Sequence, residues 1–274
     1  MLCYSTGSLP PFKDFQQLVD LLKDSPFSGI ELVITPEFLT QWKDKDYWTK
    51  SLRTLLENGF CIRNIHMGFP TLLSSTPHSP GIGAKQSEQR EQKLEAIKKS
   101  IEIAFFLEAP HFTVTTGMLD NLTPLHLQEK WVYDSMEIIV EMADHRLIVG
   151  IEQEPEHIIH STEQLLTLCK KFKGKVKANF DIGHSQVLKE NIEESLQSLF
   201  PYLYNLHFED IKKNIHQHLL FGEGEIDFLP LFTLLKKLNY KGDMTPDLYP
   251  FTDQHVKALK ASATFFKHHS LPPL

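Results

Sequence analysis

Short apolar stretches alternate with longer amphipathic ones along almost the whole chain. Runs such as GIELVI, FTVTT and KVKANFD have the length of single strands and contain many β-branched or aromatic residues. Between such runs, apolar residues return every three or four positions, as in Phe15, Leu18, Val19 and Leu22. This is the spacing of a helix with one buried face. The pattern therefore predicts strands and helices in regular alternation.

The predicted elements form eight strand–helix units. We expect strands at residues 2–5, 29–34, 60–66, 112–116, 147–152, 176–181, 203–208 and 242–248. We expect helices at residues 15–22, 48–56, 87–107, 125–142, 161–171, 192–200, 228–238 and 253–268. Alternation of this kind favours parallel strands joined by right-handed crossovers, and eight units favour a closed α/β barrel, the (β/α)8 TIM barrel. A doubly wound open sheet is the alternative.

Length and composition agree with one such domain. The chain has 274 residues, of which 41% are hydrophobic and 23% charged, and a barrel of this type needs about 250. We therefore predict a single domain over 1–274, with a frayed tail at 270–274. The Pro-, Gly- and Ser-rich segment 70–84 is the longest irregular stretch and follows the third strand. That position places it on the face where barrel enzymes carry their active sites.

The net charge indicates which binding partners to expect, and the cysteines indicate the cellular compartment. The net charge of -7 disfavours a polyanionic partner such as nucleic acid. Cys3, Cys61 and Cys169 are odd in number and widely spaced, so we interpret them as buried thiols in a reducing compartment. The first residues lack the basic and apolar regions of a secretory signal, and no apolar run is long enough to span a membrane. A cytoplasmic protein without a membrane segment is expected.

Acidic and histidine residues follow the predicted strands at their C-terminal ends. In a barrel these ends surround one shared mouth. They carry Glu31, His66, Glu152, Glu154, Asp181, His184, His207, Glu209, Asp210 and Asp247, and the loop after the seventh strand adds His216 and His218. Carboxylates and imidazoles that arrive from at least four strands form a plausible set of ligands for a divalent metal.

Several of these residues also have a purely structural interpretation. Asp181 is placed as a helix N-cap, and Asp210 as the cap of a turn. His207 faces the barrel interior if its two apolar neighbours pack outward against helices. His216 and His218 are also consistent with a solvated loop in a chain that has 14 histidines.

Other common catalytic motifs are missing from the chain. GEGEID at 222–227 lacks the GxGxxG spacing, so no dinucleotide cofactor is expected. No GxSxG or GxxxxGK[ST] occurs, which argues against a typical serine hydrolase or P-loop enzyme.

At these residues the chain resembles the xylose isomerase-like TIM barrel superfamily. That superfamily includes sugar phosphate isomerases and epimerases, dehydroshikimate dehydratases and family 2 AP endonucleases. The matching segments are GIEL at 29–32, IEQEP at 151–155, FDIGH at 180–184, LHFED at 206–210, HQHLLFGEGEID at 216–227 and DLYP at 247–250. They occur in family order and cover nearly the whole chain.

The resemblance implies a ligand set for one divalent ion, Mn2+, Mg2+, Co2+ or Zn2+. Carried over from the epimerase-like members, the metal ligands are Glu152, Asp181, His207 and Asp247. The last is a departure, because the family usually has Glu where this chain has Asp247. The shorter side chain puts a proton transfer between two glutamates in doubt.

The endonuclease branch resembles the chain at other residues. It carries the Asp-x-x-His pair, here Asp181 and His184, and it has a pair of ligands where this chain has His216 and His218. His66 also matches a ligand of that branch. However, the branch has a histidine near the end of strand four, where this chain reads TVTTG, so a three-metal cluster would lose a ligand.

The predicted function is a metal-dependent isomerase or epimerase that acts on a small sugar-like hydroxy-carbonyl substrate through an enediolate. Glu152 is the predicted base, with Asp247 opposite. The residues predicted to bind substrate or a second metal are His66, His184, His216, His218 and Glu154. The alternatives are a multi-metal phosphoesterase or AP endonuclease, a dehydratase or lyase that uses the same site, and a non-catalytic barrel. Self-association into a homo-oligomer is a further expectation.

Overall fold

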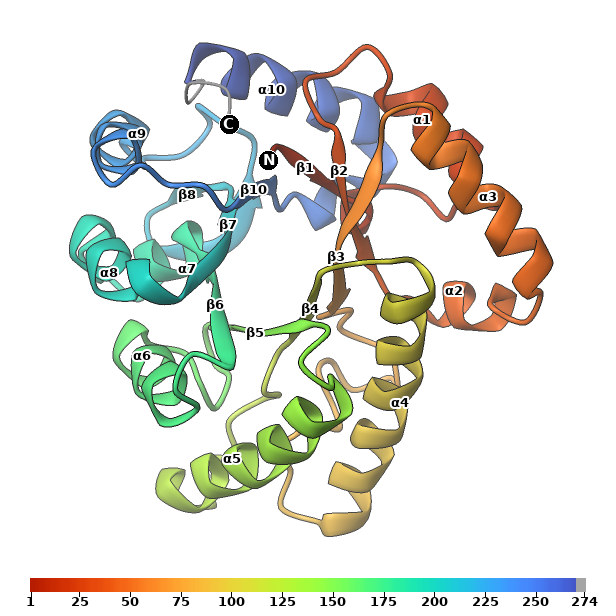
Figure 1. The fold of residues 1–274 in the computed structure, drawn as a ribbon. Coiled ribbons are helices and arrows are strands. Elements are labelled where there is room, and N and C mark those ends of the chain that lie inside the picture. Colours follow the sequence, from red (N-terminus) through yellow and green to blue (C-terminus); the bar gives the residue numbers. More distant parts are fainter. Residues whose placement is uncertain (270–274) are drawn as a thin grey trace.

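The computed structural model describes residues 1–269 and forms a ring of parallel strands enclosed by helices (Figure 1). Eight strands follow one another in the order β1-β2-β3-β4-β5-β6-β7-β10. A parallel bridge between Leu2 and Met244 brings the first strand beside the last. The predicted (β/α)8 barrel is therefore confirmed, and the doubly wound open sheet is not formed. The predicted frayed tail at 270–274 lies outside the described residues.

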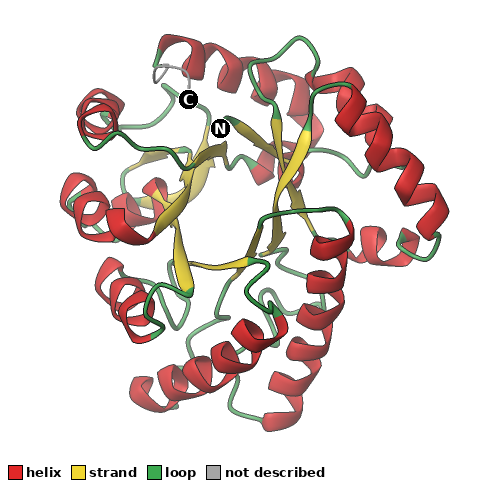
Figure 2. Ribbon diagram, viewed as in Figure 1, coloured by secondary structure: helices red, strands yellow, loops and turns green. Residues whose placement is uncertain are grey.

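All eight strands and eight helices of the predicted alternation are present, with edges that differ by a few residues (Figure 2). The barrel strands are β1(Cys3–Ser5), β2(Gly29–Val33), β3(Cys61–Met67), β4(His111–Val114), β5(Ile148–Glu152), β6(Val176–Asp181), β7(Leu203–Phe208) and β10(Asp243–Pro246). The predicted helices are α1(Phe15–Leu22), α3(Lys45–Glu57), α4(Ser87–Phe106), α5(Leu125–Met142), α6(Thr162–Lys171), α8(Ile192–Leu199), α9(Phe228–Lys237) and α10(His255–His268).

Among the α-helices and strands, four short elements were not predicted. They are the helices α2(Pro36–Gln41) and α7(Ile182–Val187) and the antiparallel hairpin of β8(Asp210–Lys212) and β9(Ile215–Leu219). Each is too short for apolar periodicity to be visible. The hairpin corrects the interpretation of residues 215–219 as a loop, because His216 and His218 lie on β9.

The outward faces of the strands pack against the helices. Phe208 lies within 6.4 Å, between ring centroids, of Phe228, Phe232, Phe265 and Phe266 from α9 and α10. Because side chains alternate along a strand, His207 faces the barrel interior, as predicted.

The barrel interior beneath the strand ends contains a network of hydrogen-bonded polar side chains. Asn64 donates to Glu31 Oε2 at 2.8 Å, and Thr113 donates to Asn64 Oδ1 at 3.0 Å. Across the barrel, Thr245 donates to Asn205 Oδ1 at 3.1 Å. Buried polar groups are costly unless they have partners, and this network supplies partners below the mouth.

The cysteines are free thiols, as expected, but only Cys3 and Cys169 are buried, and Cys61 is partly exposed. No helix within residues 1–269 is both long and apolar enough to cross a membrane.

Candidate functional site

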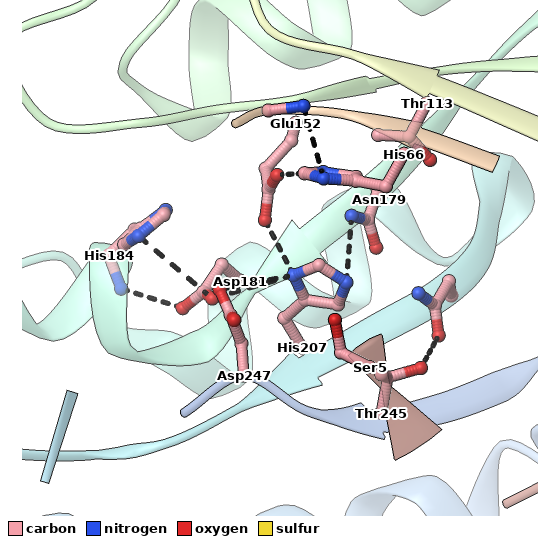
Figure 3. A network of polar contacts seen from close by, with 12 residues as sticks. Ser5, His66, Thr113, Glu152, Asn179, Asp181, His184, His207, Thr245 and Asp247 are labelled. Carbon is pink, nitrogen blue, oxygen red and sulfur yellow. Dashed lines mark hydrogen bonds and ion pairs between the residues drawn. The ribbon is translucent and has the colours of Figure 1, made fainter. Parts of the chain in front are cut away.

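Four side chains from four consecutive barrel strands meet at the C-terminal end of the barrel (Figure 3). We call them the first quartet: Glu152 ends β5, Asp181 ends β6, His207 is on β7, and Asp247 follows β10. His207 Nδ1 lies 2.6 Å from Glu152 Oε1, 3.9 Å from Asp181 Oδ2 and 3.8 Å from Asp247 Oδ2. One ligand atom from each residue lies within 4.8 Å of the other three.

The atoms that face one another in the first quartet are also those that lack hydrogen bonds. Glu152 Oε1, Asp181 Oδ2 and His207 Nδ1 are buried without a hydrogen-bond partner. Burial disfavours a charged imidazole, but the carboxylates of Glu31 and Glu152 outweigh it and raise the pKa of His207 well above its ordinary value. The buried carboxylates of Glu31, Glu152 and Asp181 surround the His207 ring and therefore require a positive charge among them. The donor set of carboxylate oxygens and one imidazole nitrogen fits a divalent metal ion.

Two neighbouring side chains orient this quartet. Gly68 N–H donates to His66 Nδ1, so the proton of His66 is on Nε2, which donates to Glu152 Oε2 at 2.7 Å. Glu31 Oε2 lies 2.9 Å from His207 Nε2. When the proton of His207 is on Nε2, the lone pair of His207 Nδ1 points toward the other three residues of the first quartet. A carboxylate behind a ligating histidine fixes its tautomer and ring orientation in many metal sites.

We expect Glu31→Gln to weaken metal binding by about 10–100-fold, the range for loss of an outer partner of a ligating histidine. The reason is that a neutral amide oxygen accepts the His207 Nε2 proton more weakly than a carboxylate does, so the ligating tautomer is less favoured. Affinity for Mn2+ or Zn2+ would be measured by competition with a chromophoric chelator. Glu37→Gln, at an exposed residue of α2, is the control. An unchanged affinity in Glu31→Gln would show that this carboxylate does not act through His207.

A second quartet lies beside the first. It consists of His184 on α7, Glu209 after β7, and His216 and His218 on β9, again with ligand atoms within 4.8 Å of one another. His218 Nδ1 is 2.6 Å from Glu209 Oε2, and the Nε2 atoms of His216 and His218 are 2.8 Å apart. His184 Nδ1 donates to the Gln153 carbonyl at 2.7 Å, which leaves Nε2 free.

The second quartet also contains buried atoms without partners. Both carboxylate oxygens of Glu209 and His184 Nε2 are buried and make no hydrogen bond. Burial raises the pKa of Glu209 well above its usual range. A side chain at Gly183 would collide with the Glu209 carboxylate, so the glycine of DIGH makes room for it. These residues also have the donor types that a divalent ion uses.

The two quartets border one cavity of about 150 Å3 at the mouth of the barrel, which we call the mouth cavity. From the first quartet, Glu152 and Asp247 line it, and from the second, His184, His216 and His218 do so. His66, Glu154, Phe69 and Tyr249 are among its other lining residues. A small molecule in this cavity would therefore be surrounded by several carboxylates and imidazoles.

The structure thus places seven of the predicted site residues in the two quartets. The other two, His66 and Glu154, belong to neither quartet but line the mouth cavity. Asp210 instead accepts backbone N–H groups from Gly222, Gly224 and Ile226, so the predicted turn-capping role is the one it has. Glu31 and Glu209 were predicted only as members of the strand-end set, and neither was among the predicted ligands of the single ion. The signal for Glu209 was present, because it stands two residues after His207 and strand alternation places both on the same side.

The sequence matches a family model for xylose isomerase-like TIM barrels over residues 19–268. Among curated relatives, an uncharacterized protein of Methanocaldococcus jannaschii is 27% identical, over 80% of this chain and 82% of its own length. An L-ribulose-5-phosphate 3-epimerase of Shigella boydii serotype 18 is 22% identical, over 93% of this chain and 89% of its own. The crystal structure of a D-tagatose 3-epimerase-like protein superposes with a TM-score of 0.79 at 20% identity, covering 98% and 96% of the two chains.

Proposed function

This chain belongs to the xylose isomerase-like TIM barrel family, and from that premise we propose that it is a divalent-metal-dependent isomerase or epimerase. Its substrate would be a small sugar or a related hydroxy-carbonyl compound. The relatives named as L-ribulose-5-phosphate 3-epimerase and D-tagatose 3-epimerase-like protein act as a guide to this class. A cytoplasmic location and a small-molecule partner belong to the same proposal.

One observation carries the proposal: the unpartnered buried atoms of the first quartet point at one another. Glu152, Asp181, His207 and Asp247 would hold the ion. When bound, a divalent ion polarises a substrate carbonyl and stabilises the negative charge that develops on its oxygen. Removal and return of the proton, and orientation of the base, are assigned to side chains of the protein.

Proton transfer is assigned to the two carboxylates of the first quartet that line the mouth cavity, Glu152 and Asp247. Glu152 would remove the proton next to the carbonyl, with Asp247 as the partner that returns one. His66 donates to Glu152 Oε2 at 2.7 Å and so holds the base in one orientation. Although Asp247 is one methylene shorter than the usual family residue, its Oδ2 lies 3.8 Å from His207 Nδ1 and therefore reaches the cluster.

The proposal is tested by incubating the metal-loaded protein with a panel of ketoses, aldoses and their phosphates in D2O. We expect one substrate class to be converted to an isomer or epimer that carries solvent deuterium at the carbon next to the carbonyl, because the proton is removed by a protein carboxylate and returned. Mass spectrometry and NMR of the product would detect it. A product that is lighter than its substrate by one water molecule would indicate a dehydratase. If the metal-loaded protein converted no member of the panel, the proposal would be contradicted.

A second candidate, a multi-metal phosphoesterase, is favoured by the second quartet, since two-metal sites are common in such enzymes. It predicts hydrolysis of a phosphodiester substrate that is lost in Glu209→Gln. The isomerase proposal predicts no such hydrolysis, so the two assays separate the candidates.

A further inference from the structure

A third group of potential ligands lies at the rim of the mouth cavity and belongs to neither quartet. We call it the rim triad: His78 from the segment between β3 and α4, and Glu154 and His157 from the segment after β5. We propose that the rim triad is a separate binding site for a borderline divalent cation such as Zn2+. This inference does not depend on the proposed reaction.

The triad has the geometry of a nearly assembled site. His157 Nε2 is 3.1 Å from Glu154 Oε2, and His78 Nε2 is 4.0 Å from the same oxygen. One ligand atom from each residue lies within 4.8 Å of the other two. Zinc–nitrogen and zinc–oxygen bonds of about 2.0–2.2 Å place tetrahedral ligands about 3.4 Å apart. The His78 Nε2 atom therefore has to approach Glu154 by about 0.6 Å, which a partly buried residue of a long loop can do.

The unsatisfied hydrogen-bonding capacity of His157 points to a ligand. This side chain is 1% exposed, and neither ring nitrogen makes a hydrogen bond. Buried polar atoms are almost always partnered, so an exception calls for a physical reason. A bound ion satisfies Nε2 and Glu154 together, and two imidazoles with one carboxylate are a ligand set that zinc uses when a position is left for water or substrate.

One nearby group opposes a cation. Lys93 on α4 is 6% exposed and has no ion-pair partner within 4.0 Å among residues 1–269. Burial lowers its pKa to about 8, while the Glu154 carboxylate acts in the other direction. The Lys93 ammonium and the Glu154 carboxylate therefore interact through space but do not form a direct ion pair. If Lys93 were instead the true partner of Glu154, replacing it would damage the triad, and this difference can be measured.

An ion in the rim triad would join two loops at the entrance of the site. His78 belongs to the 70–84 segment, and both His78 and Glu154 line the mouth cavity. Binding would therefore hold the longest irregular segment of the chain against the β5 loop, next to the substrate space.

The test is the number and affinity of zinc ions bound by the stripped full-length chain, titrated against a chromophoric chelator. We expect His157→Ala and His78→Ala each to bind one zinc fewer than wild type, or to hold that zinc more than about 100-fold more weakly, beyond the effect of losing an outer partner. His126→Ala, at an exposed position of α5, removes an imidazole outside the triad and is expected to match wild type. Lys93→Met is expected to bind zinc at least as tightly, because it removes a like charge.

Equal zinc stoichiometry and affinity in wild type, His157→Ala and His78→Ala would overturn the proposal. So would a similar loss of zinc in Lys93→Met, which would mean that the site depends on packing and not on ligation. His78 lies on a half-buried loop, so its variant keeps the test informative if His157→Ala does not fold. Because the readout is a difference in zinc between variants, a failure to find sugar isomerase activity leaves it unaffected.

Discussion

Replacing Glu152 by glutamine is expected to lower kcat by about 10²–10⁴-fold, the contribution typical of a general base. The amide keeps nearly the same shape and retains an oxygen for the first quartet, but it cannot accept a proton. Glu152 is 1% exposed, lines the mouth cavity and is held by His66, so solvent cannot easily replace it. The measurement is steady-state kinetics on the substrate identified in the D2O panel, at saturating metal.

A control variant and a metal measurement accompany Glu152→Gln, to separate loss of the base from a change of charge and from loss of the ion. Glu137→Gln, at an exposed position on α5, changes the charge equally and should retain full activity. Metal content of Glu152→Gln should be determined in the same preparation. A fully loaded Glu152→Gln enzyme with wild-type kcat would show that another group removes the proton.

Stripping the protein of metal with a chelator is expected to abolish activity and to lower the midpoint of thermal unfolding by about 5–10 °C. The first quartet holds three carboxylates and one imidazole, three of them almost fully buried. Without a cation these carboxylates repel one another in a poorly solvated site. An ion present at 100 times its dissociation constant stabilises the fold by about 2.7 kcal/mol, and each kcal/mol shifts the midpoint by about 2–4 °C in a domain of this size.

Differential scanning calorimetry with and without chelator measures this effect, and activity is followed in parallel. Restoring Mn2+, Co2+ or Zn2+ should recover both the midpoint and turnover, and comparing the three identifies the ion that supports turnover best. His207→Gln should have a low midpoint at the outset and respond little to chelator. A midpoint that does not move on stripping wild-type protein would argue against an ion in the buried quartet.

Periodicity predicted the barrel well because it reports which face of each element is buried. The helix at 125–142 and the strand at 176–181 have the predicted bounds. In the strand, the alternating residues Val176, Ala178 and Phe180 are buried, and in the helix, Val132, Met136 and Ile139 form a buried face at helical spacing. The elements that periodicity missed, α2, α7 and the β8–β9 hairpin, are three to six residues long. Elements of that length present too few residues for a repeat to be recognised.

The candidate site was predictable where it depends on strand ends. Glu152, Asp181 and His207 stand at or near the ends of neighbouring parallel strands, and the barrel closes those ends around one mouth. Glu31 was visible by the same rule, but its contact with the far nitrogen of His207 depends on the register across the barrel. His78 and His157 were not visible, since both lie in loops, where no repeat relates sequence position to direction.

The order of strands and helices and the barrel that they form follow from the sequence, because a strand's direction and alternation are local properties. The same rule places acidic and histidine residues at the mouth, and the resemblance to the family singled out four of them as ligands. The tertiary structure alone decided which side chains share a ligand space: two quartets side by side and a third group at the rim. Those groupings depend on the paths of the irregular segments and on the register between distant strands, and neither leaves a periodic trace in the chain.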